Sequence, residues 1–298
     1  MMQPLTESRN LRTQQIDRLS TVEILEVIND EDASVATVIR EVLPAIAQAV
    51  DVITAQIRLG GRLIYAGAGT SGRLGVLDAV ECQPTFSTPP EMVQALLAGG
   101  EPAMTQAVEG AEDRYEAGKT DLLALNATAA DVVIGIAASG TTPYVIGVLD
   151  TANALGAKTV AISCNAPAPI LDRASIKIVA LVGPEVITGS TRMKAGTAQK
   201  MILNMLTTTS MIKLGKVYGN LMVDVRVTNQ KLANRARGMV AEVVGTGQEE
   251  AARLLQMSHN EVKTAIVVGL LNISVEEARQ RLTENRGMLR NVIELPLE

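Results

Sequence analysis

A glycine-rich turn between an apolar run and a helical pattern constrains this chain more than any other feature. Leu63 to Ala66 form a short apolar run, and residues 67–72 then read Gly-Ala-Gly-Thr-Ser-Gly. Apolar residues with helical spacing follow, namely Leu74, Leu77 and Val80. A strand is therefore expected to pass through a tight turn into a helix, whose unpaired N-terminal backbone N–H groups attract an anion such as phosphate.

Composition limits the class of protein and the kinds of partner. A chain of 298 residues is long enough for two folded units. Apolar residues make up 47% of the chain but aromatic residues only 2%, so the core must consist of Ala, Val, Ile, Leu and Met. The net charge of −5 and the lack of any Lys- or Arg-rich run argue against a nucleic-acid partner.

Neither the cysteines nor the N-terminal residues suggest export. Cys82 and Cys164 are the only cysteines, too few for a disulfide framework and without the Cys-x-x-Cys spacing of a metal site. The N-terminal residues lack the apolar stretch of a signal peptide, and no apolar run approaches the ~18 residues of a membrane span. We therefore expect a soluble, cytoplasmic protein without a membrane partner.

Strand and helix patterns alternate through the middle of the chain. This alternation is typical of a parallel sheet with helices on both faces. We predict a doubly wound α/β domain with a mainly parallel, five-stranded sheet at residues 55–218, an N-terminal helical segment at 1–54 and a C-terminal all-helical module at 219–298. The β-rich runs are residues 62–66, 92–97, 131–137, 158–163 and 176–182.

Helices are predicted on both sides of this α/β domain. Residues 1 to about 19 are polar and show no helical or strand pattern, but Ser20 and Glu23 then form a capping box that starts a helix. A longer helix is expected at 34–59, and the last helix of the α/β domain at 192–214. The tail helices are expected at 228–244, 248–257 and 259–270, with a fourth that begins at the capping box of Ser274 and Glu277.

The opening turn matches the Gly-x-Gly-x-x-Gly pattern through Gly67, Gly69 and Gly72. Dinucleotide binding also requires an acidic residue at the end of the next strand, and here Glu91 precedes that strand. The hydroxyls of Thr70 and Ser71 suit the oxygens of a compact phosphate monoester. Three interpretations therefore remain for this turn: a phosphate monoester site, a dinucleotide site and a merely structural turn.

Two further turns favour a phosphorylated sugar. Ser139 and Thr142 lie in a Gly-containing turn after the strand at 131–137, and Ser190 lies in another after the strand at 176–182. The carboxyl ends of strands are where open α/β sheets bind ligands. Ser, Thr and Gly are common in loops, but this preference explains one such turn better than three.

Three runs of sequence resemble a known family. They are Gly67 to Arg73, Ala107 to Asp113 and Thr188 to Thr197. They resemble the sugar isomerase (SIS) fold and, within it, the N-acetylmuramic acid 6-phosphate etherases, over nearly the whole chain. The tail resembles a ubiquitin-associated-type module. The glucokinase regulatory proteins share the first turn and are relatives that bind sugar phosphates without converting them.

The resemblance implies a lyase reaction on an amino sugar of the cell wall. The D-lactyl ether at C3 would be eliminated and water added, giving N-acetylglucosamine 6-phosphate and D-lactate. Two carboxylates suffice for this chemistry, so no metal or redox cofactor is expected. The resemblance assigns the acid that protonates the leaving lactate to Glu81, and it makes Glu112 the residue for proton removal. The implied substrate-binding residues are Gly69, Thr70, Ser71, Ser139, Thr142 and Ser190.

Other polar residues near these motifs have two interpretations each. Arg192 and Lys194 could contact the substrate phosphate or lactyl carboxylate, or could cap solvent-facing turns. The lone His259 is expected at a helix terminus or on the surface, and Cys82 is expected to serve in packing. Thr141 stands where many etherases are expected to carry an arginine, which bears on substrate affinity more than on the type of reaction.

Two other functions and a geometric problem remain open at this point. A non-catalytic sugar-phosphate regulatory protein and an aldose–ketose isomerase would share the fold. An unbroken helix from Ser71 to Glu81 would place the two ends ~15 Å apart, too far for one sugar. The helix could break near Gly75, the chain could return Glu81 by another path, or Glu81 could serve the neighbouring subunit. We predict a homodimer, because SIS-type domains commonly pair and the N-terminal helices have apolar faces to bury, and we favour a shared site near the subunit interface.

Overall fold

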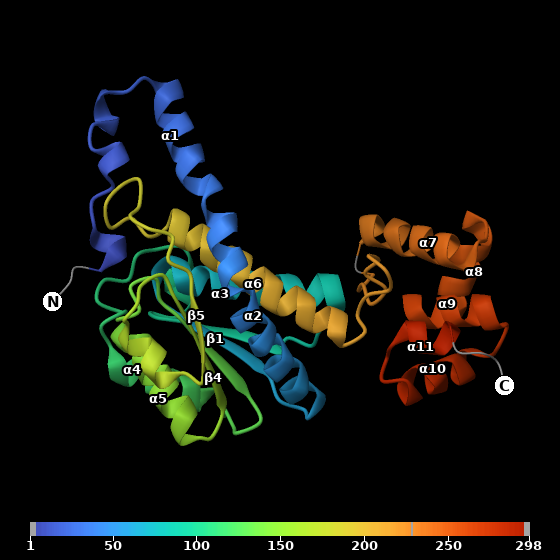
Figure 1. Cartoon of the computed structure of the whole chain (residues 1–298). Helices are drawn as coiled ribbons and strands as arrows, with labels where there is room; N and C mark the ends of the chain where they lie inside the picture. The colour runs from blue at the N-terminus through green and yellow to red at the C-terminus, as the bar shows by residue number, and fades with distance from the viewer. Residues whose placement is uncertain (1–3, 228, 295–298) are drawn as a thin grey trace. The chain divides into compact units, whose positions relative to one another are not determined.

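The computed structural model describes residues 4–227 and 229–294, and its centre is a five-stranded, all-parallel sheet (Figure 1). The order across the sheet is β2-β1-β3-β4-β5. Each predicted run forms a strand, which confirms the doubly wound α/β fold. The strands are β1 (Leu63–Gly67), β2 (Val93–Leu97), β3 (Val132–Ile136), β4 (Lys158–Ser163) and β5 (Ile176–Val179).

Helices cover both faces of the sheet, as the apolar strands require. α4 (Tyr115–Ala124) and α5 (Pro143–Ala154) lie on one face, whereas α2 (Val35–Arg58), α3 (Gly69–Phe86) and α6 (Lys194–Lys213) lie on the other (Figure 1). Every residue of β1 and β3 is buried, because side chains that alternate along a strand meet a helix on either side. The buried core under α4 and α5 includes Ile64, Val133, Leu122, Tyr144 and Val148.

The N-terminal segment is packed, although its sequence is polar and without a pattern. It forms three short 3₁₀ helices, at Leu5–Glu7, Leu11–Thr13 and Ile16–Arg18. Thr6 and Thr13 are buried; Thr6 N–H donates to Asn165 Oδ1 at 3.2 Å, and Thr13 Oγ1 donates to the carbonyl of Val186 at 2.8 Å. This segment is thereby held against the loops that follow β4 and β5, which its sequence did not predict.

The following helices begin where the sequence predicted. α1 (Thr21–Ala33) has the capping box of Ser20 and Glu23, with both hydrogen bonds formed. By length and composition alone, Thr21–Arg58 is apolar enough to cross a membrane, with a mean hydropathy of 1.3, so the expectation that no stretch approaches a membrane span was wrong. In the fold α2 packs on β5 and β3 and buries Ile39, Ile46, Val50 and Ile53.

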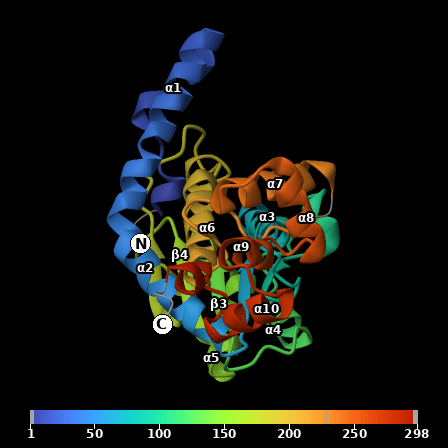
Figure 2. The ribbon, with the colours of Figure 1, turned by 90° about the vertical axis from the view of Figure 1, so that its right-hand side faces the viewer.

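By its internal contacts the chain divides into two compact units, Met1–Val80 with Pro90–Thr207, and Glu81–Pro89 with Thr208–Glu298. The second unit has its own helical core (Figure 2), in which α9 is the central helix with Val262 to Val268 all buried. The short α11 was not predicted, because five residues are too few to show a period. The helices are α7 (Gln230–Val244), α8 (Gln248–Met257), α9 (Val262–Leu271), α10 (Val275–Glu284) and α11 (Leu289–Ile293).

Candidate active site

The turn between β1 and α3 requires glycine at three positions. Gly69 has φ of +53°, in the left-handed region. A Cβ on Gly67 would lie 2.7 Å from Gly72 N, and a Cβ on Gly72 would lie 2.5 Å from Gly67 O. The turn is therefore tight because neither backbone carries a side chain, and the first turn of α3 starts directly at the carboxyl end of β1.

The sheet order places a second turn beside the first. β1 pairs with β2 on one side and with β3 on the other, and Gly67 is level with Ile136 at the end of β3. This is the point where the strand order reverses, the usual ligand site of such sheets. Ser139 and Thr142 lie in the turn after β3; Thr142 precedes α5, and its hydroxyl makes no capping hydrogen bond.

The third turn reaches the same region through α6. Ser190 follows β5, the edge strand, which lies far from β1 in the sheet order. The chain then enters α6, where a Cβ on Gly196 would lie 3.4 Å from Thr70 Cγ2. The first turn of α6 therefore lies against the first turn of α3, and Ser190 is close in sequence to that contact.

Lys194 takes neither of the roles that the sequence suggested. Its side chain is 3% exposed, and Nζ binds Glu31 Oε2 at 2.6 Å in a buried ion pair with α1. Burial raises the pKa of Glu31, but Lys194, Asn10 and Arg12 together outweigh burial and lower that pKa. The Lys194 ammonium is thus occupied within the fold, whereas Arg192 is exposed.

A buried carboxylate already fills the N-terminus of α6. Glu185 accepts hydrogen bonds from the backbone N–H groups of Lys194 and Ala195, both at 2.9 Å. Burial raises the pKa of Glu185, and these two hydrogen bonds lower it in part. The N-terminus of α3 is consequently the better candidate for an anion from a ligand.

Glu112 lies beside the first turn. A cavity of about 180 Å³ is lined by Gly69 of that turn and by Arg73, Glu109 and Glu112 among others. The carbonyl of Glu112 accepts the backbone N–H of Tyr144 at 2.9 Å, which ties Glu112 to the start of α5, next to Thr142. The structure therefore brings Glu112 together with two of the predicted binding turns.

Arg73 holds the loop that carries Glu112. Its Nε donates to the carbonyl of Ala103 at 2.8 Å, and its Nη2 donates to the carbonyl of Gln106 at 3.0 Å. Arg73 lines the same small cavity as Glu109 and Glu112. No residue pattern marked Arg73 as a residue of this site, because its acceptors are carbonyls of a loop distant in sequence.

Glu81 lies on the same helix as Ser71 but far along it. α3 is unbroken from Gly69 to Phe86, which excludes a break near Gly75, one of the three alternatives that the sequence left open. A Cβ on Gly75 would lie 3.1 Å from Tyr65 Cβ, which indicates that this glycine allows close packing on β1. At ~1.5 Å per residue Glu81 is ~15 Å from Ser71, and it does not line the small cavity.

The buried hydrogen bonds that hold α3 were not predicted from the sequence either. Asp78 is 6% exposed and accepts hydrogen bonds from Tyr65, Asn204 and Thr207 at 3.0, 2.8 and 3.2 Å. Burial raises the pKa of Asp78, and these donors lower it in part. The carboxylate thereby joins β1, α3 and α6 behind the candidate site.

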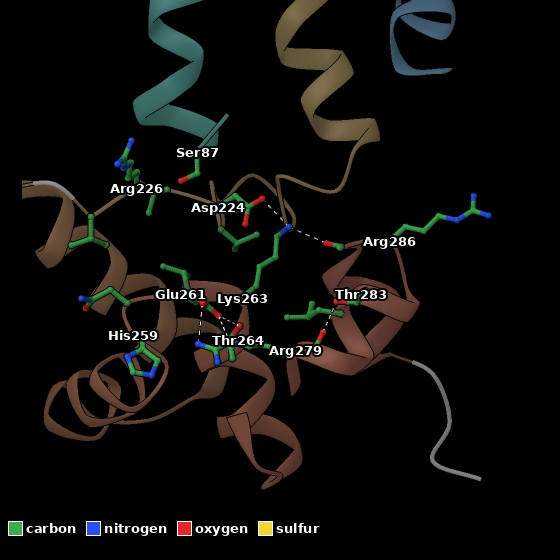
Figure 3. A pocket seen from close by; sticks show the side chains of 17 residues that line it. Ser87, Asp224, Arg226, His259, Glu261, Lys263, Thr264, Arg279, Thr283 and Arg286 are labelled. Carbon is green, nitrogen blue, oxygen red and sulfur yellow. Dashed lines mark hydrogen bonds and ion pairs between the residues drawn. The ribbon is translucent and has the colours of Figure 1, made fainter. Parts of the chain in front are cut away.

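A larger cavity, of about 860 Å³, lies in the C-terminal unit (Figure 3). Lys263 binds Asp224 Oδ2 and the carbonyl of Gly287, both at 3.0 Å, and burial lowers its pKa. His259 lines this cavity, exposed and with φ of +51° just after α8. None of the predicted catalytic or substrate-binding residues lines it.

Known proteins match both the fold and the sequence. The profile of the glucokinase regulatory protein N-terminal SIS domain matches residues 45–153, and that of the SIS domain matches residues 108–209. Proteins named N-acetylmuramic acid 6-phosphate etherase from Pectobacterium atrosepticum and Vibrio vulnificus are 55% and 56% identical to this chain, over 97% and 96% of its length and 95% of their own. The chain belongs to this etherase family.

Solved structures with a similar fold include sugar-phosphate isomerases. A phosphoheptose isomerase from Francisella tularensis superposes with a TM-score of 0.50 at 19% identity, and the match covers 63% of this chain and 98% of that chain. The SIS fold is thus shared between the etherase family and sugar-phosphate isomerases. Activity has to be argued from the site residues, because one fold serves several reactions.

Proposed function

We propose that this protein is a lyase that cleaves the D-lactyl ether of N-acetylmuramic acid 6-phosphate. The products are N-acetylglucosamine 6-phosphate and D-lactate, as expected in the recycling of cell-wall amino sugars in the cytoplasm. The observation that carries this proposal is the 55–56% identity to proteins named for this activity over nearly the whole chain. The site geometry supports it, because Glu112 and the first turn line the same cavity.

The phosphate of the substrate binds at the first turn of α3 in this proposal. The backbone N–H groups of Gly69, Thr70 and Ser71 have no acceptor within the helix, and a helix N-terminus favours negative charge. No Cβ would meet another atom within 4 Å at Gly69, so space is open beside it. The hydroxyls of Ser139, Thr142 and Ser190 hold the remaining phosphate and sugar oxygens.

The reaction needs one base and one acid. Opening of the sugar ring exposes an aldehyde at C1, which makes the proton at C2 acidic. Glu112 removes that proton, the C3–O bond breaks, and Glu81 protonates the departing lactate oxygen, which leaves a C2–C3 double bond. Water then adds, with hydroxide at C3 and a proton at C2, and proton transfers of this kind contribute ~10²–10⁴ in rate each.

The active molecule is a homodimer in this proposal, and Glu81 serves the site of the partner. Two features of α3 support it. The helix carries Glu81 ~15 Å away from its own phosphate-binding turn. The neighbouring Leu77 and Val80 are each 53% exposed, as expected for apolar side chains that a second subunit would cover. α1 and α2 offer further apolar surface, because Val22, Leu25 and Leu43 are exposed.

Release of D-lactate from N-acetylmuramic acid 6-phosphate tests the reaction, and hydrogen exchange tests the two roles. In Glu81→Gln the base is intact, so we expect the C2 proton to exchange with solvent deuterium while lactate release falls by ~10²–10⁴. In Glu112→Gln both exchange and release should be lost. Glu116→Gln, at an exposed position of α4, is the matched control and should keep both.

Failure of the wild-type protein to release lactate would overturn the proposal. The glucokinase regulatory profile that matches residues 45–153 makes a non-catalytic sugar-phosphate sensor the second candidate. Binding of the sugar phosphate without any lactate or C2 exchange would support that sensor. Exchange at C2 with a ketose product would instead indicate an isomerase.

A further inference from the structure

Ser71, a proposed phosphate ligand, has a buried partner that the proposed function does not use. Its hydroxyl lies 2.9 Å from Oε1 of Gln199 on α6, and the two side chains come from opposite ends of the domain's sequence. Ser71 is 8% exposed and Gln199 is 1% exposed. The contact is therefore shielded from water and specific in its geometry.

The orientation of this amide has a clear chemical consequence. With Oε1 toward Ser71, the amide nitrogen Nε2 of Gln199 is buried and has no hydrogen-bond partner among the described residues. A buried donor without an acceptor is destabilising, because it has lost its hydrogen bonds to water. A serine hydroxyl has one proton, so in this orientation Ser71 gives it to Gln199 and has none for a phosphate.

Rotation of the amide by half a turn frees the Ser71 proton, and it replaces the unpaired buried nitrogen of Gln199 with the amide oxygen. The oxygen and nitrogen of a glutamine amide have nearly the same shape, and their assignment follows from the hydrogen-bond network. Nε2 then donates to Ser71 Oγ, which accepts that bond and keeps its own proton to donate. The natural acceptor for that proton is an oxygen of an anion at the N-terminus of α3.

We infer that Gln199 is a positioning residue for phosphate binding, which donates to Ser71 Oγ and so directs the Ser71 hydroxyl proton at a phosphoryl oxygen of the substrate. This inference rests on the proposed function, since it presumes a phosphate at the first turn of α3. Gln199 itself touches no phosphate, because its amide atoms lie behind Ser71 and are shielded from solvent.

The packing of α6 on α3 holds Gln199 in place for this role. Near the start of α6, a Cβ on Gly196 would lie 3.4 Å from Thr70 Cγ2. Further along α6, Asn204 Nδ2 donates to Asp78 on α3 at 2.8 Å. Gln199 lies between these two contacts, so its backbone is fixed relative to Ser71 on both sides.

A double-mutant cycle on Ser71 and Gln199 tests the inference in the full-length protein. The readouts are the KM for N-acetylmuramic acid 6-phosphate and the inhibition constant of inorganic phosphate. Hydrogen bonds to charged groups are worth ~1.5–3 kcal/mol, so Ser71→Ala should raise both constants by ~10-fold or more with a smaller change in kcat. Gln199→Met should raise both as well, and the double variant should match Ser71→Ala alone.

Two further variants keep the test decisive. Gln199→Glu has the same size but only accepts hydrogen bonds, so it should take the Ser71 proton, add negative charge and weaken phosphate binding more than Gln199→Met. Thr209→Ala, at an exposed position further along α6, should leave both constants unchanged. Thermal unfolding of each variant separates a loss of binding from a loss of structure.

The results distinguish an error in the phosphate role of Ser71 from an error in the role of Gln199. If Ser71→Ala leaves both constants unchanged, the phosphate role of Ser71 is wrong and the inference about Gln199 falls with it. If Ser71→Ala weakens binding but Gln199→Met does not, only the inference about Gln199 is overturned. Additive effects in the double variant would also overturn it, because Gln199 would then act independently of Ser71.

Discussion

Glu31 and Lys194 form an ion pair that is almost completely shielded from water. Their side chains are 8% and 3% exposed, and Arg12 binds the other oxygen of Glu31 at 3.0 Å. Removal of one partner from a buried pair leaves a charge without compensation, which is more damaging than removal of both. The pair also links α1 to the start of α6, next to the loop that carries Ser190.

Lys194→Met should therefore lower the free energy of unfolding by ~3–5 kcal/mol, because it removes the buried cation of the pair and leaves the Glu31 carboxylate with Asn10 and the exposed Arg12. The double variant Glu31→Gln with Lys194→Met should recover part of this loss. Urea denaturation of the wild type, the single variant and the double variant measures the three free energies of unfolding. A double variant less stable than Lys194→Met would show that the buried charge is not the cause.

Asp131 gives the fold a dependence on pH. It is 1% exposed and binds Arg62 through a backbone N–H, Nε and Nη2 at 2.9, 3.0 and 2.8 Å. Burial raises the pKa of Asp131, but Arg62 and the backbone N–H of Thr128 outweigh burial and lower that pKa. A lowered pKa means that the folded state holds the carboxylate charged more strongly than the unfolded chain does.

The stability that comes from Asp131 should be fully present above the unfolded pKa of ~3.9 and should be lost as pH falls through the lower folded value. The difference in unfolding free energy between the wild type and Asp131→Asn should accordingly shrink below about pH 4. Denaturant titrations from neutral to acid pH measure this difference. Asp172→Asn, at an exposed site, is the control and should differ little from the wild type at any pH.

At the scale of the elements, α4 and α5 pack so closely that glycine is required where they cross. A Cβ on Gly147 of α5 would lie 2.1 Å from the carbonyl oxygen of Tyr115, and a Cβ on Gly118 of α4 would lie 2.1 Å from that of Tyr144. The backbone N–H of Tyr144 in turn binds the carbonyl of Glu112. The crossing of these helices therefore sets the position of a proposed catalytic residue.

Gly147→Ala should force α4 and α5 apart and lower stability by ~1–3 kcal/mol, the usual effect of overpacking. Because the start of α5 holds Glu112, kcat should fall as well. Gly238→Ala on α7 is the matched control. No atom lies within 4 Å of the Cβ position of Gly238, so alanine at this helical position should raise the free energy of unfolding by ~0.5–1 kcal/mol. Equal effects of the two substitutions would contradict this account.

At the scale of the whole molecule, the proposed dimer completes each site with a residue from the other subunit. A symmetric dimer contains two equivalent sites, each with Glu112 from one chain and Glu81 from its partner. Variants that each lack one of these groups are then inactive alone. A mixed dimer of the two variants would contain one intact site and one site with neither group.

A mixture of Glu81→Gln and Glu112→Gln protomers should thus recover activity when subunits exchange, to about a quarter of the wild type for random pairing. D-lactate release before and after mixing measures this. The same variants mixed under conditions that prevent exchange provide the baseline. If the exchanged mixture stays at that baseline, both carboxylates act in one chain, and the proposed sharing of the site is wrong.

Local sequence patterns predict the strands and the edge of the sheet at which ligands bind. The hydrophobic period, the capping box at Ser20 and the turn chemistry around Gly69 are local signals. Every strand and the helices α1, α2, α3 and α6 therefore lie where the sequence predicted them. Parallel order then placed the turns with Ser71 and Ser139 at one edge, since all strands of such a sheet point the same way.

Contacts between residues far apart in the sequence become known only from the three-dimensional fold. The pairs Lys194 with Glu31 and Ser71 with Gln199 join residues 163 and 128 positions apart, and no local pattern records such contacts. For the same reason the polar N-terminal segment gave no hint that Thr6 is buried. Gly75 is an example of what a sequence leaves open. From the sequence alone, Gly75 could have broken α3, but the structure shows that α3 is continuous and that Gly75 allows Tyr65 to pack closely against it.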